Sequence, residues 1–265
     1  VPEETKKIAD AYWPGPLTMI FEKSEAVPYG TTGGLDTVAV RMPSDEVARA
    51  LIDAGGGYIA APSANTSGRP SPTMAEHVEE DLTGRIDMIL DGGPVSIGLE
   101  STILDMTVTP PMILRPGAIT KEMLEACIGE VTVDKAVIKP NQRPKAPGMK
   151  YRHYAPKADL SIVEGEMSKV IPKINELAAE QVKAGHKVGI IGTEESVANY
   201  TCGDVKSIGT REDESTIAVH LFAILREFDA DQVDYIYSES FDTEGIGSAI
   251  MNRLLKAAGH HVITV

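Results

Sequence analysis

The sequence predicts an α/β protein in two parts: a mixed-sheet domain of α+β character, followed by a small Rossmann-like three-layer domain. Three observations support this expectation. Short apolar runs and helical patterns mix without strict alternation in the first half, strands and helices alternate regularly in the last third, and a proline-rich stretch separates them. A chain of 265 residues is long enough for two such domains.

The first part, residues 1–134, combines five apolar runs that predict strands with four periodic segments that predict helices. Thr73 and Glu76 have the spacing of a capping box before one of these helices. In the run Thr37-Val-Ala-Val-Arg41, alternation puts Thr37 and Arg41 on one face and turns Val38 and Val40 toward the core. The predicted strands cover 37–41, 58–61, 86–90, 101–105 and 112–115; the predicted helices cover 2–12, 45–54, 74–82 and 121–127.

The last part, residues 159–265, has a more regular pattern. One predicted helix lies between each predicted strand and the next, which favours a mostly parallel sheet with helices on its faces. The predicted strands cover 160–163, 187–191, 233–237 and 262–265, and the predicted helices cover 167–184, 215–228 and 247–258.

The segment 135–158 differs from both parts in charge and composition. It carries seven basic residues and no acidic one, whereas residues 1–134 have a balance of −12 and residues 159–265 one of −9. Its prolines predict an extended connector. The acidic body, with a net charge of −14, weighs against non-specific nucleic-acid binding. The basic segment is either a solvated linker or a partner for one compact polyanion, such as a nucleotide.

Other classes of protein are disfavoured by composition. No stretch approaches the roughly 20 apolar residues of a membrane span, and the first residues lack the features of a signal peptide. Cys127 and Cys202 are too far apart in sequence for a metal-ligand motif. We therefore expect a cytoplasmic protein with no membrane partner and no protein-bound metal site.

Polar residues gather in one loop and at several strand ends. The loop 60–73 supplies hydroxyls, an amide and free backbone N–H groups that would suit phosphates, although turn chemistry selects the same residue types. Arg41 could grip a carboxylate or form an edge ion pair. Ser101 and Arg115 could complete an anion pocket or serve as ordinary strand-end residues. We find no convincing nucleophile–base pair, which argues against covalent catalysis.

Together these residues resemble the YrdC/Sua5 family of threonylcarbamoyl-AMP synthases, in its long two-domain Sua5 form. The resemblance covers essentially the whole chain and keeps the family's order of motifs. The matching segments are Trp13-Pro-Gly-Pro-Leu-Thr18, Val40-Arg-Met-Pro43, Pro62-Ser-Ala-Asn-Thr-Ser-Gly68, Ser101-Thr-Ile-Leu-Asp105, Leu114-Arg-Pro-Gly-Ala118 and Pro147-Gly-Met-Lys-Tyr-Arg-His-Tyr-Ala-Pro156.

The resemblance implies a YrdC-like catalytic domain (1–134), a basic linker that folds over the pocket (135–158) and a Sua5 C-terminal domain (159–265). It implies a nucleotidyltransferase that makes threonylcarbamoyl-AMP and pyrophosphate from L-threonine, bicarbonate and ATP, for the threonylcarbamoyladenosine (t6A) modification of tRNA. Mg²⁺ would accompany ATP. The product would pass to a tRNA threonylcarbamoyl transferase complex, and contact with tRNA is one further implied interaction.

The resemblance also implies roles for individual residues. No residue is implied as a chemical catalyst, and Ser63, Asn65 and Arg115 would act by positioning the substrates. The threonine site would contain Arg41, Ala61 and Ser101. The ATP site would contain Thr37, Ser63, Asn65, Ser71 and Arg115, together with Tyr151, His153 or Tyr154 from the linker.

One departure from the family pattern concerns the start of the chain. Family members have roughly 80 further residues before the segment that matches Val1, including a Lys-x-Arg motif for ATP. We therefore expect this chain alone to be incomplete as an enzyme. Two other classes stay open: an RNA-binding module, and a nucleotide-sensing interaction protein that binds ATP without turnover.

Overall fold

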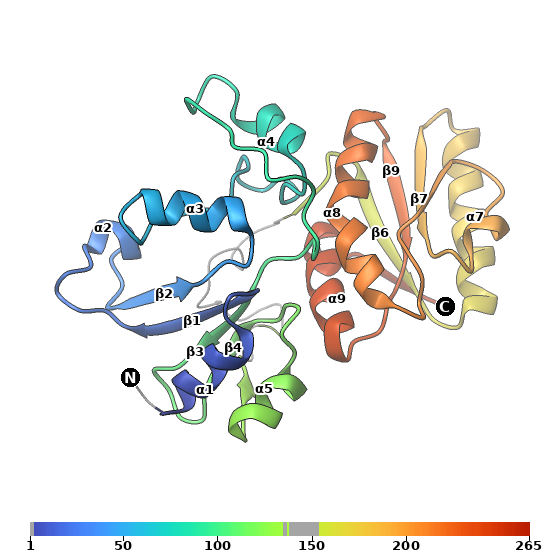
Figure 1. Cartoon of the computed structure of the whole chain (residues 1–265). Helices are drawn as coiled ribbons and strands as arrows, with labels where there is room; N and C mark the ends of the chain where they lie inside the picture. The colour runs from blue at the N-terminus through green and yellow to red at the C-terminus, as the bar shows by residue number, and fades with distance from the viewer. Residues whose placement is uncertain (1–2, 135–136, 138–153) are drawn as a thin grey trace. The chain divides into compact units, whose positions relative to one another are not determined.

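The computed structural model describes residues 3–134, 137 and 154–265 (Figure 1). The chain forms two compact units, and each unit combines segments that are distant in sequence. Unit 1 comprises Val1–Pro62 and Glu100–Lys150, and unit 2 comprises Ser63–Leu99 and Tyr151–Val265. No helix in the described part of the chain is long and apolar enough to cross a membrane.

Unit 1 is built on a mixed sheet of five strands. The strand order is β2-β1-β3-β4-β5; β1 pairs antiparallel with β2 and parallel with β3, and β3 pairs antiparallel with β4. Its core, which includes Ile8, Met19 and Leu124, joins the sheet to α1 and α5. The elements are α1 (Glu3–Tyr12), β1 (Leu17–Glu22), α2 (Tyr29–Thr32), β2 (Thr37–Arg41), α3 (Glu46–Ala54), β3 (Thr102–Asp105), β4 (Met112–Arg115), α5 (Lys121–Ile128) and β5 (Thr132–Val133).

Unit 2 contains a parallel five-stranded sheet of order β10-β6-β9-β7-β8. Helix α7 packs on β6, β7 and β9, while α8 and α9 pack against each other on the opposite face (Figure 1). Unit 2 also includes α4. The elements are α4 (Ala75–Leu82), β6 (Asp159–Glu164), α7 (Met167–Lys183), β7 (Val188–Gly192), a short 3₁₀ turn (Val197–Asn199), β8 (Asp204–Ser207), α8 (Glu214–Ala230), β9 (Tyr235–Glu239), α9 (Gly245–Ala257) and β10 (Val262–Thr264).

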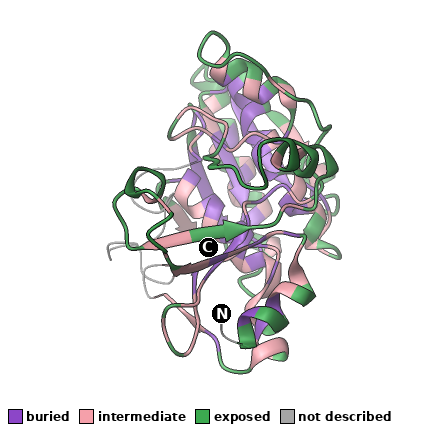
Figure 2. Ribbon diagram, turned by 60° about the vertical axis from the view of Figure 1, so that its left-hand side comes forward, coloured by how far each residue is buried: buried purple, intermediate pink, exposed green. Residues whose placement is uncertain are grey.

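The largest cluster of buried hydrophobic residues among those described lies in unit 2. Strand β7 is buried along its whole length, and β6 is exposed only at its two ends. Figure 2 shows the buried residues in purple along the inner strands and helices. Strands that are buried on both faces require helices on both sides of the sheet. The structure therefore confirms the predicted mixed-sheet part followed by a Rossmann-like three-layer part.

Several local predictions are wrong. Residues 58–61 and 86–90 form no strand; Tyr58 is 87% exposed and Met88 is 73% exposed. An apolar run becomes a strand only where a neighbouring strand pairs with it. The predicted capping box is also absent. Helix α4 begins after Met74 without a side-chain cap, because the Thr73 hydroxyl lies 3.3 Å from the Nδ1 atom of His77 instead.

The expectation that Val38 and Val40 both face the core is wrong for Val40, which is 41% exposed. Val40 pairs with Met19, a fully buried residue of the neighbouring strand. The difference follows from position, because β2 is the edge strand of its sheet and β1 is an inner strand. Val38 is half-buried.

Candidate functional site

A row of polar side chains runs across the sheet of unit 1, with members on β1, β2 and β4 and one member, Ser101, directly before β3. Thr18 on β1 pairs with Arg41 on β2, and the hydroxyls of Thr18 and Ser101 share a hydrogen bond of 2.7 Å. Arg115, at the end of β4, donates from Nε to the Ser101 carbonyl oxygen at 3.1 Å and from Nη2 to the Ser101 hydroxyl at 3.2 Å. We call Arg41, Thr18, Ser101 and Arg115 the strand row. It places two hydroxyls between two guanidinium groups.

The backbone next to Ser101 is fixed by the buried side chain of Thr102. The Thr102 hydroxyl donates to the carbonyl oxygen of Ile119 at 2.7 Å and accepts from the Ile119 amide at 3.1 Å. Gly117 permits the close approach of this segment, because a Cβ there would lie 2.5 Å from the Thr102 nitrogen. Ser101 itself is only 6% exposed. The hydroxyl of the strand row is therefore held rigidly rather than carried on a free loop.

The strand row has the chemistry of an anion site. A guanidinium donates two parallel hydrogen bonds to a carboxylate or phosphate, and a hydroxyl can donate a third. Arg41 is exposed to solvent, so a small ligand can reach it. Thr37 does not belong to the row. It lies four residues away on the same face, about 13 Å along the strand, where it pairs with Glu22.

Ala61 and Ser63 lie in exposed, irregular backbone. The chain continues from there into the polar loop that the sequence singled out. We call Ser63–Thr73 the nucleotide loop, after the role that the resemblance implies for several of its residues. In this loop the Asn65 side-chain amide donates to the carbonyl oxygens of Thr66 at 3.0 Å and Arg69 at 3.3 Å. Thus Asn65 orders the turn, while its Oδ1 atom is buried without a hydrogen-bond partner among the described residues.

The nucleotide loop is anchored at its end by a buried histidine. The Thr73 amide donates to the Nδ1 atom of His77 at 3.1 Å, which requires an unprotonated nitrogen there. Burial, followed by the positive charge of Arg226, lowers the pKa of His77. The neutral imidazole therefore holds the end of the loop. Ser71, earlier in the loop, is half-buried.

Of the three linker residues expected near the nucleotide, the structure describes only Tyr154. Tyr151 and His153 lie outside the described residues. Tyr154 is 6% exposed, and its ring packs on Phe222 of α8 with 5.1 Å between the centroids. The Tyr154 side chain is therefore part of the apolar core of unit 2.

The predicted site residues thus fall into two groups, one in each compact unit. Arg41, Ser101 and Arg115 lie together in the strand row, and the residues 63–71 lie in the nucleotide loop of unit 2. The prediction missed Thr18, which joins Arg41 to Ser101. A signal was present, because Thr18 ends the motif that starts at Trp13.

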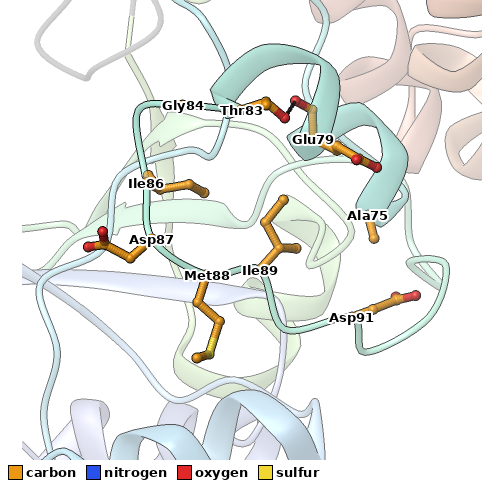
Figure 3. Close-up of a pocket in the computed structure, with 9 residues that line it drawn as sticks. All are labelled: Ala75, Glu79, Thr83, Gly84, Ile86, Asp87, Met88, Ile89 and Asp91. Carbon is orange, nitrogen blue, oxygen red and sulfur yellow. Dashed lines mark hydrogen bonds between the residues drawn. The ribbon is translucent and has the colours of Figure 1, made fainter.

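A separate pocket of about 430 Å³ lies beside α4 (Figure 3). It contains none of the predicted site residues. Three of its lining residues are acidic and none is basic, so it would repel a polyphosphate. The lining residues are Ala75, Glu79, Thr83, Gly84, Ile86, Asp87, Met88, Ile89 and Asp91.

Comparison with known proteins connects both parts of the chain to one family. A family model described as the threonylcarbamoyl-AMP synthase C-terminal domain matches residues 119–259. The Sua5/YciO/YrdC family model, described as "Telomere recombination", matches residues 1–117.

Individual relatives match along the whole chain. Threonylcarbamoyl-AMP synthase from Pyrococcus abyssi is 50% identical over 266 residues, which cover 100% of this chain and 76% of the relative. The Bacillus subtilis enzyme of the same name is 50% identical, covering 99% and 75%. The crystal structure of P. abyssi Sua5 complexed with L-threonine has a TM-score of 0.92 and 48% identity, covering 100% of this chain and 76% of that one. The chain belongs to the Sua5/YrdC family of threonylcarbamoyl-AMP synthases.

Proposed function

We propose that the protein makes threonylcarbamoyl-AMP and pyrophosphate from L-threonine, bicarbonate and ATP, as a nucleotidyltransferase in t6A modification of tRNA. The observation that carries this proposal is the strand row, because it presents two guanidinium groups and two hydroxyls in a chain that is 50% identical to enzymes of this name. The threonine complex of P. abyssi Sua5 supports the amino-acid substrate. The division into a catalytic domain (1–134), a linker (135–158) and a C-terminal domain (159–265) is part of the proposal.

In this proposal the threonine site lies at the strand row. Arg41 binds the threonine carboxylate, because its guanidinium can form two hydrogen bonds with it. The rigid Ser101 hydroxyl and the backbone at Ala61 complete the site. Truncating one partner of a charge pair that the bound ligand covers costs about 2–5 kcal/mol of binding.

ATP is held by residues that supply hydroxyls, an amide and one cation. Arg115 neutralises phosphate charge, and the Asn65 amide, bonded to the carbonyl oxygens of Thr66 and Arg69, holds the turn of the loop in place. Such a set positions phosphates without forming covalent bonds to them. The proposed ATP residues are Thr37, Ser63, Asn65, Ser71 and Arg115, with Tyr151, His153 or Tyr154 from the linker.

The reaction then needs positioning more than acid–base chemistry. The threonine amine forms a C–N bond with the carbon of bicarbonate and water is lost, giving a carbamate. A carbamate oxygen attacks the α-phosphorus of ATP, the bond to the bridging oxygen breaks, and pyrophosphate leaves with the electron pair. Two anionic reactants must approach each other, so the cations of the site lower the barrier by offsetting their repulsion.

Mg²⁺ enters this proposal with the nucleotide. The described residues hold no group of three or more His, Cys, Asp or Glu side chains that could bind a metal ion. Mg²⁺ usually takes only a few protein ligands and is bound largely by substrate phosphates and water, so the residues present fit a metal carried by ATP. Its chemistry would be to neutralise phosphate charge. We further propose a cytoplasmic location and transfer of the product to a tRNA threonylcarbamoyl transferase complex.

The test is pyrophosphate release by the full-length protein, with threonine and bicarbonate each present or omitted. Release that requires both small substrates supports the synthase. ATP binding without release would instead favour the nucleotide-sensing alternative, and tight, steeply salt-dependent binding of RNA without release would favour the RNA-binding one.

A further inference from the structure

Helix α8 of the C-terminal part reaches the nucleotide loop through one buried arginine. The Arg226 side chain is 2% exposed. It donates to the Pro70 carbonyl oxygen from Nε at 3.1 Å and from Nη2 at 2.6 Å. Its Nη2 atom also donates to Oδ2 of Asp81 at 2.8 Å. A residue 156 positions later in the chain therefore binds the backbone of the loop directly.

Asp81, at the end of α4, holds the other side of the same loop. Its carboxylate accepts from the Thr66 amide at 3.0 Å and forms an ion pair with Arg69. Burial alone would raise the pKa of Asp81, but the hydrogen bonds from Arg226 and Thr66 and the nearby arginine charges lower it overall. Asp81 is therefore charged at neutral pH, and the loop turns around it.

A second aspartate ties the end of the linker to this cluster. Asp229 of α8 accepts from the Lys157 amide at 2.6 Å and lies 3.7 Å from Nη2 of Arg69. The Ala155 amide donates to the carbonyl oxygen of Gly68, within the loop, at 2.9 Å. Residues at the end of the linker are thus bonded both to α8 and to the loop.

These contacts meet the loop where its position matters for ligand binding. Thr66, Arg69 and Pro70 lie between Asn65 and Ser71, which we place at ATP. A group of four buried or half-buried charges is a weak source of net stability. It does, however, fix backbone positions, and a misplacement of about 1 Å in a site can lower a rate about 100-fold.

We propose that Arg69, Asp81, Arg226 and Asp229 form a clamp by which the C-terminal domain positions the nucleotide loop for ATP. The clamp assigns a role to α8 in the synthase reaction, with Arg226 and Asp229 as positioning residues that do not touch substrate. The assignment to ATP rests on the proposed function, while the holding of the loop rests on the contacts alone.

The test uses Arg226→Lys in the full-length protein. Lysine keeps the charge but cannot form the paired bonds to Pro70 and Asp81 together. We expect at least a tenfold higher KM for ATP, a KM for threonine changed by less than twofold, and at least tenfold faster amide hydrogen exchange in Ser63–Thr73. Asp229→Asn, which keeps an acceptor for the Lys157 amide, is the milder second variant. It should also raise the KM for ATP and the rate of amide hydrogen exchange in Ser63–Thr73.

The matched control is Arg211→Lys. Arg211 pairs with the fully buried Glu239 in the same unit, Nη2 to Oε2 at 2.6 Å, and Nη2 also donates to the Ser240 carbonyl oxygen and to Sδ of Met167. Arg211→Lys should lower the stability of the protein while leaving amide hydrogen exchange in Ser63–Thr73 and the KM for ATP unchanged. The clamp is overturned if Arg226→Lys and Asp229→Asn behave like Arg211→Lys in both quantities.

Hydrogen exchange separates the clamp from the synthase proposal. If the unaltered protein releases no pyrophosphate, the proposed function fails. Amide hydrogen exchange in Ser63–Thr73 then still tests whether the clamp holds the loop. Faster exchange confined to the Arg226 and Asp229 variants supports the clamp in that case, and equal exchange in all variants overturns it.

Discussion

The pair formed by Asp81 and Arg226 gives a quantitative prediction for stability. Asp81 has a fully buried side chain and Arg226 is 2% exposed. Removing one partner of a buried pair leaves an uncompensated charge and costs about 3–5 kcal/mol. We expect Asp81→Leu to lower the free energy of unfolding by about that amount, because Arg69 and Arg226 both lose their buried partner. Arg226→Met should cost less, because Arg69 still pairs with Asp81.

Combining the two substitutions should cost less than the sum of the single effects. The double variant removes both charges, so neither is left buried without the other. We therefore expect a coupling free energy of at least about 1.5 kcal/mol. Urea-induced unfolding of the full-length protein, followed by circular dichroism and fluorescence, measures all four members of the cycle.

A more exposed ion pair, between strand β8 and the residue that follows α8, is the control. Lys206 and Asp231 are 2.9 Å apart, with side chains 20% and 50% exposed. Asp231→Asn should change the free energy of unfolding by less than about 1 kcal/mol. Additive single effects in the cycle between Asp81 and Arg226, or a cost no larger than that of the control, would refute the reasoning from burial.

Three further predictions concern the site and its support. Arg41→Ala should weaken threonine binding by about 2–5 kcal/mol while changing ATP binding much less. Calorimetric titration measures both affinities, and an unchanged affinity for threonine would show that its carboxylate does not bind Arg41. Gly117→Ala should cost about 1–3 kcal/mol of stability, because its Cβ would lie 2.5 Å from a backbone nitrogen of the adjoining segment. Gly30→Ala, where a Cβ meets nothing within 4 Å, is the control, and equal thermal shifts would contradict the argument. His77 should make the protein less stable in acid: its pKa is lowered by burial, so its contribution is complete above about pH 6.5 and is lost as pH falls from there toward the lower folded pKa. His77→Asn, which keeps an acceptor for the Thr73 amide, should flatten the dependence of unfolding on pH in that range, and an unaltered profile would exclude His77 as the source.

The strands of the parallel sheet in unit 2 could largely be predicted from the sequence, for a physical reason. Strands such as β6 and β7 are buried on both faces, so each is a short apolar run between periodic helices. The same signal predicted the edge strands β2 and β10 but is absent from a third edge strand. Strand β8 (Asp204–Ser207) contains two charged residues in four and has no fully buried position, and it was not predicted. Strand β1 was also missed, because it follows the turn residues of Trp13–Pro16 directly.

The residue types of the site could be predicted from the sequence, but the contacts from distant segments that hold the site in place could not. Arg41, Ser101 and Arg115 stood out as polar groups at strand ends, and hydrogen bonds do join Ser101 and Arg115. No local pattern indicated that Arg226, in the middle of an amphipathic helix, contacts Pro70. Such a contact depends on the folded arrangement of segments far apart in sequence, and sequence periodicity carries no information about it.

The distance in sequence between Arg226 and Pro70 also has a consequence in time. The two residues are 156 positions apart, and a ribosome adds about 5–20 residues per second. The nucleotide loop therefore leaves the ribosome on the order of ten seconds before the helix that holds it has been made. During that interval Asp81 has no Arg226 to pair with, and the loop is open to proteases and chaperones. Nascent chains arrested before α8 should accordingly be cleaved within Ser63–Thr73, whereas chains released after α9 should resist cleavage there.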